Sequence, residues 1–264
     1  MKLASLKGGR DGRLVVVSND LAWFTEAHHI APTLQVALDQ WQGCEPALRG
    51  LAEGLEHGAV PKERFHEHQA ASPLPRAYQR LVGDGTRQAE SDHFLGPREP
   101  ISLGAAGALD LEISVVAITG DVPRGATPEQ ALAAVRLVML CNEVTLRDRR
   151  AVGVVLGKPA CAFSPVAVTP DVLPGWTGGK LSGALEVELN GKALAEVEPG
   201  SAPDFGALIA QAARVRPLAA GTIVDAGPVA KASDVQAGDT VRIALRDAKR
   251  HTVFGAIEQT VGEG

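Results

Sequence analysis

The stretch Leu109–Thr119 limits the possible folds more than any other part of the sequence, because its residues alternate with a period of two. One face of the extended segment would carry Leu111, Ile113, Val115 and Ala117, and the other would carry Asp110, Glu112, Ser114 and Val116. This alternation is typical of a β-strand with one face against a hydrophobic core. We therefore expect a sheet that contains this strand.

The second half of the chain is predicted to be rich in further strands. Leu185–Leu189 alternates cleanly and precedes Asn190-Gly191, a dipeptide that favours a tight type I′ hairpin turn. Three more strands are expected, at Thr222–Val224, Asp239–Leu245 and Thr252–Thr260. The order of elements favours an α+β fold, rich in β-structure, with a curled mixed sheet rather than regular βαβ alternation.

Two helices are predicted within this β-rich part. Thr127-Pro128-Glu129-Gln130 has the features of a helix start, with Thr as N-cap, Pro in the first turn and Gln at the third position. We expect this helix to run to about Asn142 and to bury Leu132, Val135 and Met139. A shorter helix is expected over Pro203–Arg214.

The first 80 residues are predicted to form a small N-terminal α/β domain. It would contain a strand at Arg13–Ser18 and helices at Ala31–Trp41 and Glu45–Glu56. An irregular stretch follows, and residues 101–264 form the main domain.

The composition narrows the class of protein. With 26 Lys plus Arg against 31 Asp plus Glu, the net charge is −5, which does not favour nucleic-acid binding. No apolar run reaches the ~18 residues of a membrane helix, and no secretory signal is visible. The 3 cysteines are widely spaced and form no zinc or disulfide pattern, so we expect reduced thiols in a cytoplasmic protein.

Candidate chemistry begins with acidic side chains. Asp110 and Glu112 share one strand face, and Glu143 follows the predicted helix, so the three could coordinate Mg²⁺ or Mn²⁺. The alternative is a solvated strand face with an acid at a helix end. Lys158, in an apolar setting, could hold a substrate carboxylate or enolate, or could instead extend to solvent.

An ordered set of short motifs resembles the fumarylacetoacetate hydrolase family. The motifs are Leu109-Asp110-Leu111-Glu112, Met139-Leu140-Cys141-Asn142-Glu143, Lys158-Pro159, Asn190-Gly191, Leu218-Ala219-Ala220-Gly221-Thr222-Ile223 and Ala237-Gly238-Asp239-Thr240-Val241. Ser72-Pro73-Leu74-Pro75-Arg76-Ala77-Tyr78 extends the resemblance towards the N-terminus. The resemblance implies a mixed β-sheet roll, usually a homodimer, in which three acids bind Mg²⁺, Mn²⁺ or Ca²⁺. Family enzymes cleave, decarboxylate or isomerise small oxo acids, and they use no organic cofactor.

The family motifs transfer to this chain with changes. Glu112 matches the first acid of the family's Glu-x-Glu, Ser114 replaces the second, and Glu143 stands where the family has Asp. Lys158 matches the family lysine. The family's Gly-Thr-Pro turn appears as Ala226-Gly227-Pro228. Residues 81–100 resemble a shortened connecting loop, where the family normally has its lid and catalytic His. Losing one carboxylate ligand predicts weaker binding of a hard cation.

Three functions follow as hypotheses. The first is an enzyme acting on a small oxo acid or 1,3-dicarbonyl by proton transfer, isomerisation, dehydration or cyclisation. In it, Glu112 or Glu143 is the general acid/base, Lys158 the electrophile or carboxylate clamp, and Asp110 and Ser114 contact substrate. The second is a conventional Mg²⁺- or Mn²⁺-dependent C–C hydrolase or decarboxylase. The third is a non-catalytic relative that binds a ligand or a partner, including a homologous subunit. No hypothesis includes a nucleic acid or a membrane.

Overall fold

The computed structural model describes residues 1–83, 85–102, 108–146, 160–199 and 204–263. In this part of the chain, 11 strands form one large sheet in the order β4-β3-β2-β1-β11-β9-β8-β16-β5-β6, with β10 paired to β9. These strands are β1 (Lys2–Leu6), β2 (Arg13–Val17), β3 (Trp23–Glu26), β4 (Glu63–Arg64), β5 (Arg80–Val82), β6 (Arg87–Ala89), β8 (Leu109–Thr119), β9 (Val135–Leu146), β10 (Ala160–Phe163), β11 (Ala167–Val168) and β16 (Ile223–Val235). The fold is therefore rich in β-structure, as expected.

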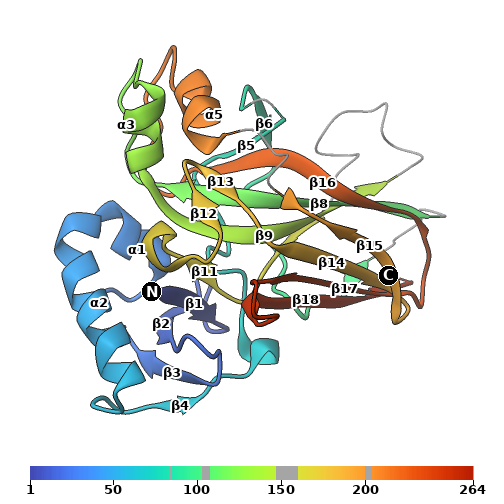
Figure 1. Cartoon of the computed structure of the whole chain (residues 1–264), viewed down its shortest axis with the longest axis horizontal. Coiled ribbons are helices and arrows are strands. Elements are labelled where there is room, and N and C mark those ends of the chain that lie inside the picture. The colour runs from blue at the N-terminus through green and yellow to red at the C-terminus, as the bar shows by residue number, and fades with distance from the viewer. Residues whose placement is uncertain (84, 103–107, 147–159, 200–203, 264) are drawn as a thin grey trace.

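A second sheet of 5 strands lies beside the first and has the order β15-β14-β17-β18-β7 (Figure 1). Its members are β7 (Ile101–Ser102), β14 (Ala184–Leu189), β15 (Lys192–Val197), β17 (Thr240–Arg246) and β18 (Thr252–Gly262). A small pair, β12 (Trp176–Thr177) and β13 (Lys180–Leu181), completes the described strands. Parallel and antiparallel pairings both occur, which makes the architecture mixed.

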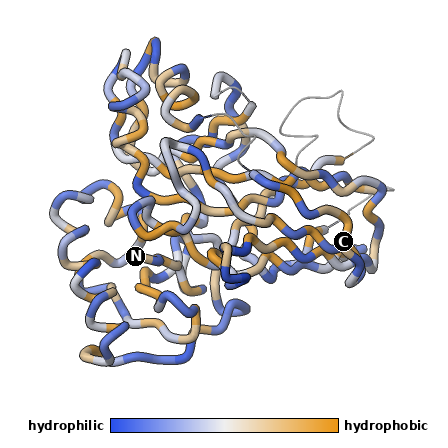
Figure 2. The backbone as a smooth tube through the Cα atoms, viewed as in Figure 1, coloured by the Kyte–Doolittle hydropathy of each residue, from blue (hydrophilic) through white to orange (hydrophobic). Residues whose placement is uncertain are grey.

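The long strand β8 is buried on both faces. Leu111, Ile113 and Val115 belong to a core cluster that also includes Val187 and Ile243 of the second sheet. The opposite face continues as Val116 and Ile118, which pack in a separate cluster with the N-terminal helices. Figure 2 shows hydrophobic residues along these central strands. The sequence predicted one buried face; the second is covered because the N-terminal unit packs against it.

The N-terminal unit places two helices against its strands, as predicted. These helices are α1 (Leu34–Asp39), whose N-cap Thr33 accepts a hydrogen bond from the Val36 amide, and α2 (Trp41–Glu56). Leu34 and Leu48 are buried with Leu14 of β2. The helical spacing of apolar residues therefore identified the covered face correctly. None of the helices in the described ranges has the length and hydropathy needed to cross a membrane.

The helix expected from Thr127 to about Asn142 is much shorter than predicted. Its N-terminal signal was right, since Thr127 and Gln130 form a reciprocal capping box. The helix α3 (Pro128–Ala133) ends early, and the next residues form β9 instead. Eleven registered pairs between β8 and β9 include Glu112 opposite Glu143. Pairing with a neighbouring strand thus overrides the helical spacing, and Glu143 lies within a strand rather than after a helix.

Several other predicted elements were confirmed near their expected bounds, whereas the strand expected at Thr222–Val224 continues to Val235 as β16. Asn190 and Gly191 adopt φ values of 53° and 71°, as a type I′ turn between β14 and β15 requires. The second helix of the main domain is α5 (Phe205–Ala212), capped by Asp204. The predicted start of this helix, Pro203, lies outside the described residues.

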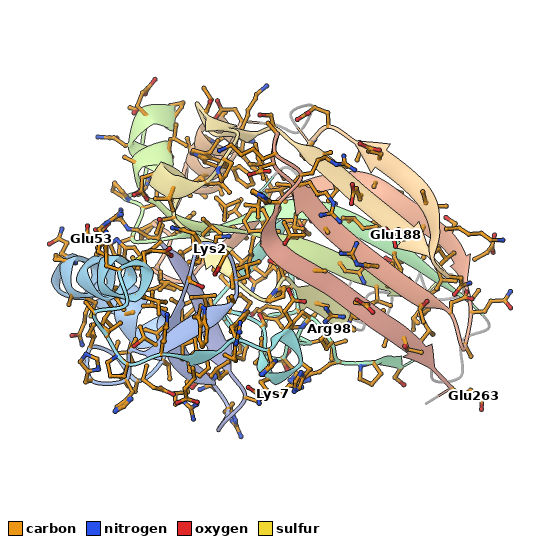
Figure 3. The ribbon with its side chains drawn as sticks, turned by 60° about the horizontal axis from the view of Figure 1, so that its bottom comes forward. Lys2, Lys7, Glu53, Arg98, Glu188 and Glu263 are labelled. Atoms are coloured by element: carbon orange, nitrogen blue, oxygen red, sulfur yellow. The ribbon has the colours of Figure 1, made fainter. Side chains whose placement is uncertain are left out.

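The segment predicted as a shortened connecting loop contains a small hairpin. Strand β5 pairs with β16 in parallel, so that Arg80 lies opposite Ile223, and antiparallel β6 follows at the edge of the large sheet. Gly83 has a φ of 73°, which suits the turn. After the hairpin, Arg98 lies beside β18 (Figure 3) and pairs with Glu67 and Glu258, which ties the N-terminal unit to the second sheet. The hairpin brings one charged side chain, Arg80, into the interior.

Candidate active site

A buried arginine is the centre of the candidate site. The Arg80 side chain is fully buried, and its Nη2 lies 2.6 Å from Glu143 Oε1 and 3.4 Å from Asp225 Oδ2. Its Nη1 lies 3.5 Å from Glu90 Oε1, at the end of the hairpin. One guanidinium thus meets three carboxyl groups from three parts of the chain. A buried charge requires such pairing, because transfer from water is otherwise strongly unfavourable.

Asp225 is oriented by an irregularity in β16. The register with β8 shifts between Asp225, opposite Val116, and Pro228, opposite Ser114, which leaves one extra residue on β16. Gly227, with a φ of 89°, donates its amide to Asp225 Oδ1 at 2.8 Å. Such a β-bulge redirects a side chain. Here it brings Asp225 Oδ2 within 3.0 Å of Ser114 Oγ, which donates a hydrogen bond to it.

The Asp225 carboxyl is well suited to hold a proton. Burial raises its pKa above the ordinary value for an aspartic acid, and the negative charge of Glu143 acts in the same direction. Arg80, the Gly227 amide and the Ser114 hydroxyl oppose the shift, but the pKa remains raised. The weaker of the two Nη2 contacts, 3.4 Å against 2.6 Å, also falls on Asp225. Asp225 can therefore exchange a proton more readily than a strongly ion-paired acid.

Two cysteine thiols border the charged cluster. Cys141 Sγ lies 3.9 Å from Arg80 Nη2 and 3.0 Å from Cys161 Sγ, and both cysteines are buried and reduced. Burial raises the pKa of the Cys141 thiol well above its usual value, and its contact with Cys161 acts in the same direction. A neutral, buried thiol is a poor nucleophile. The pair therefore serves as packing beside the guanidinium.

The structure brings only some of the predicted site residues together. Ser114 and Glu143 both contact the cluster around Arg80, as described above. Glu112 shares their strand face, but its carboxylate accepts a hydrogen bond from Lys231 Nζ at 2.8 Å in a more exposed position. Asp110 accepts a hydrogen bond from the amide of Asp234 at 3.3 Å. Lys158 lies outside the described residues.

Sequence reasoning did not select Arg80, Asp225 or Glu90. Two signals were available. Arg80 precedes Leu81-Val82, two residues that favour a strand. The local sequence does not show, however, that the Arg80 side chain points inward. Asp225 directly precedes Ala226-Gly227-Pro228, the turn matched to the family's Gly-Thr-Pro. Their contact joins positions 145 residues apart in the sequence, and only the fold reveals it.

The acidic residues present do not fit a divalent cation. The ion would lie beside the guanidinium of Arg80, which already binds Glu143 and approaches Asp225. The positive charges of the ion and the guanidinium would repel each other at such close range. A hard cation also requires several oxygen ligands that are not already paired with another cation. Ser114 supplies only a neutral hydroxyl, which is committed to Asp225. In the described residues, no group of at least three His, Cys, Asp or Glu side chains is arranged to hold a metal ion.

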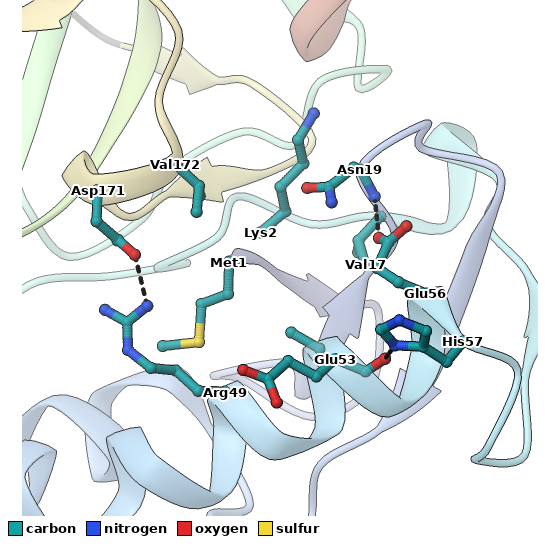
Figure 4. Close-up of a pocket in the computed structure, with 11 residues that line it drawn as sticks. Met1, Lys2, Val17, Asn19, Arg49, Glu53, Glu56, His57, Asp171 and Val172 are labelled. Atoms are coloured by element: carbon teal, nitrogen blue, oxygen red, sulfur yellow. Dashed lines mark hydrogen bonds and ion pairs between the residues drawn. The ribbon is translucent and has the colours of Figure 1, made fainter.

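A separate cavity of about 280 Å³ lies between α2 and the N-terminal strand (Figure 4). Arg49 crosses one side of it to bind Asp171 of the 3-10 helix η3 (Pro170–Val172), at 2.6 Å. Lys2 also lines the cavity and donates to the carbonyl of Val253 at 2.8 Å. Burial lowers the pKa of Lys2 to about 8. These contacts link the N-terminal unit to η3 and to β18 and do not include any residue of the Arg80 cluster.

Family models match almost the whole chain. Residues 1–76 match the model described as fumarylacetoacetase N-terminal domain 2. Residues 84–262 match the model of the fumarylacetoacetate (FAA) hydrolase C-terminal region. No curated protein sequence matches closely enough to add to this.

Solved structures show the same fold at low sequence identity. Maleylpyruvate hydrolase from Sphingobium sp. SYK-6 is 18 % identical with a TM-score of 0.77, and the match covers 100 % of both chains. The complex of that hydrolase with manganese(II) and pyruvate has a TM-score of 0.74 at 19 % identity, covering 99 % of this chain and 100 % of the other. A 5-carboxymethyl-2-hydroxymuconate delta-isomerase from Mycobacterium smegmatis is 16 % identical, with a TM-score of 0.68 and coverage of 99 % and 98 %.

These neighbours include both hydrolases and an isomerase, so the shared fold does not specify one reaction. The fold of the chain and its two family matches agree with the motifs quoted from the sequence. The chain belongs to the fumarylacetoacetate hydrolase family.

Proposed function

We propose that this protein is an enzyme that moves protons on a small oxo acid or 1,3-dicarbonyl compound, without the metal-dependent hydrolysis typical of its family. The observation that carries the proposal is the cluster of Arg80 with Glu143, Asp225 and Ser114. It keeps acidic groups in the interior of the family fold but gives them an organic cation as partner. Such a set can support acid–base chemistry.

In this proposal Asp225 is the group that accepts and returns the proton. Its Oδ2 contacts Ser114 Oγ, and its Oδ1 is held by the Gly227 amide, so its orientation is fixed. Glu143 keeps the shorter contact to Arg80, at 2.6 Å. Proton removal from the carbon beside the oxo group gives an enolate, and return of the proton to a different carbon completes an isomerisation. No C–C bond breaks in this sequence.

The substrate class follows from chemistry that the family fold supports. One structural neighbour was solved in complex with manganese(II) and pyruvate, and another is a 5-carboxymethyl-2-hydroxymuconate delta-isomerase. Pyruvate and a 2-hydroxymuconate both carry a carboxylate next to an oxo or enol carbon. We therefore propose that a 2-oxo acid is the simplest compound that this site accepts.

Proton exchange provides a direct test of this function. Protein treated with EDTA is incubated with 2-oxobutanoate in D₂O, and loss of the C3 proton signal is followed by NMR. We expect catalysed exchange that Asp225→Asn reduces at least a hundredfold, within the usual range for loss of a general base. The matched control is Glu188→Gln, which changes an acid to its amide on the second sheet, where Glu188 pairs with Arg242.

Two other results would replace the proposal. Cleavage of acetylpyruvate to acetate and pyruvate that requires added Mn²⁺ would identify a conventional hydrolase. Absence of exchange and cleavage, with oxo acids still bound, would identify a non-catalytic relative. Of these two, the contact between Arg80 and Glu143 favours the non-catalytic relative over the conventional hydrolase, because Glu143 is already paired with a guanidinium at 2.6 Å.

A further inference from the structure

The guanidinium of Arg80 is surrounded by the groups that the family resemblance assigns to a cation. Glu143, in the position of one family ligand, lies 2.6 Å from its Nη2. Ser114, in the position of another, donates to the same Asp225 oxygen that faces Nη2 at 3.4 Å. The arginine therefore lies at the point where these side chains converge. It also arrives from the hairpin of β5 and β6, a different part of the chain.

Arg80 and Ser114 complement each other electrostatically. Ser114 removes one negative charge from the family pattern, and Arg80 brings one positive charge that is fully buried. Arginine remains protonated in proteins, so the charge is permanent. An acid at position 114 would add a fourth carboxyl group to a cluster that contains one guanidinium. Serine instead offers a hydroxyl that stabilises Asp225.

Arg80 also has hydrogen-bond donors that find no acceptor among the described residues. Its Nε and Nη1 are buried and make no hydrogen bond, although Nη1 lies 3.5 Å from Glu90. Buried N–H groups of a charged side chain are almost always satisfied, because leaving them unpaired costs free energy. The two unused donors therefore indicate a missing acceptor. An anionic oxygen is the strongest acceptor for a guanidinium.

We propose that Arg80 replaces the divalent cation in this site and donates a hydrogen bond to an anionic oxygen of the bound ligand. The choice of an oxo acid as that ligand rests on the proposed function, whereas the replacement of the cation does not. Nη1 is one of the two unused donors, and Glu90 Oε1 lies 3.5 Å from it. An incoming anion must compete with Glu90 for this donor.

Binding of oxalate tests the proposal without any turnover. Oxalate presents a carboxylate beside a second anionic oxygen, as the enolate of a 2-oxo acid does. Isothermal titration calorimetry in EDTA is expected to show binding to the wild-type protein. Arg80→Lys keeps the charge but loses the forked donor geometry, and we expect at least a tenfold weaker affinity. The matched control, Arg242→Lys on the second sheet, is expected to bind like the wild type. Glu90→Gln removes the competing charge and is expected to bind more tightly.

A reciprocal experiment tests the cation directly. The wild-type protein is expected to show no Mn²⁺ binding at millimolar concentration, by calorimetry and by the Mn²⁺ resonance signal. The double variant Arg80→Met/Ser114→Glu removes the guanidinium and restores an acid, so it is expected to bind Mn²⁺. Circular dichroism verifies that each variant is folded. If Arg80→Lys does not fold, the affinity of the wild-type protein for oxalate, measured with and without Mn²⁺, still tests whether the ligand needs the metal ion.

Specific outcomes would overturn the proposal. Oxalate that binds only when Mn²⁺ is present, or equal affinity in Arg80→Lys and the wild type, would show that Arg80 is not the ligand's cation. Tight Mn²⁺ binding by the wild type would do the same. The proposed function can fail separately. If oxalate binds through Arg80 but the protein catalyses no proton exchange, this inference holds and the proposed enzymatic function is wrong.

Discussion

Two ion pairs lie on the same face of the large sheet, around β8 and β9, and differ chiefly in their environment. Deep in the sheet, Arg80 and Glu143 approach to 2.6 Å with side chains 0 % and 6 % exposed. Nearer the surface, Lys231 and Glu112 approach to 2.8 Å with side chains 59 % and 20 % exposed. The distances are alike, but water screens only the second pair. Contact distance alone therefore does not distinguish the two pairs, whereas burial does.

Removing the buried cation is the largest expected effect. Arg80→Met leaves Glu143 and Asp225 buried without their counter-charge, and we expect a loss of about 3–5 kcal/mol in the free energy of unfolding. Urea denaturation followed by circular dichroism measures it. Arg80→Met/Glu143→Gln should recover part of the loss, because one stranded charge is gone. A loss near that of a surface pair would contradict the contrast between the two regions.

The difference in burial between the two ion pairs could not be predicted from the sequence, and the reason is physical. Alternation along Leu109–Thr119 correctly placed Glu112 and Ser114 on one face of a strand. It could not say where along that face the solvent ends. That boundary depends on the hairpin of β5 and β6 and on β16, whose pairing partners are distant in the sequence. Glu112, one of the residues predicted to be catalytic, thus lies at the more exposed end.

The wrong helix prediction has a similar origin. The Thr127 capping signal is local and was confirmed, but the end of the helix is decided by tertiary pairing. Apolar residues at 132, 135 and 139 fit a helical stripe, yet Val135 and Met139 pair with β8. The family motifs identified the family because they preserve turns and order. They did not reveal Arg80 or Asp225, which lie outside the quoted motifs.

A smaller effect is expected from the hydroxyl in the buried cluster. Ser114→Ala removes the hydrogen bond to Asp225 Oδ2, and we expect a loss of about 1–2 kcal/mol in the free energy of unfolding. Denaturation in urea again provides the measurement. Ser182→Ala is the control, because its hydroxyl bonds the Gly175 carbonyl in an exposed turn. Equal losses in the two variants would mean that burial adds nothing to the contribution of Ser114.

The pH dependence of stability separates the two regions further. Because burial raises the pKa of Asp225, the folded state retains a proton that the unfolded state releases, and stability falls as the pH rises through the folded-state pKa. Asp225→Asn cannot titrate there. The difference in unfolding free energy between variant and wild type should therefore shift in favour of the variant with rising pH. Thermal denaturation across pH 4 to 8 (roughly the range where proteins are most stable) measures the shift. A difference independent of pH would show that Asp225 is ionised throughout.

The smallest effect is expected at the exposed pair. Lys231→Gln removes the partner that donates to Glu112 at 2.8 Å, and we expect a change of no more than about 0.5 kcal/mol, because Lys231 is 59 % exposed. Urea denaturation at low and high salt measures it, and the small difference should shrink further as salt screens the charges. Proton exchange on 2-oxobutanoate should remain near the wild-type rate. A loss comparable to that of Asp225→Asn would move the reacting group from the buried cluster to the surface end of β8, because only there does Lys231 make its contact with Glu112.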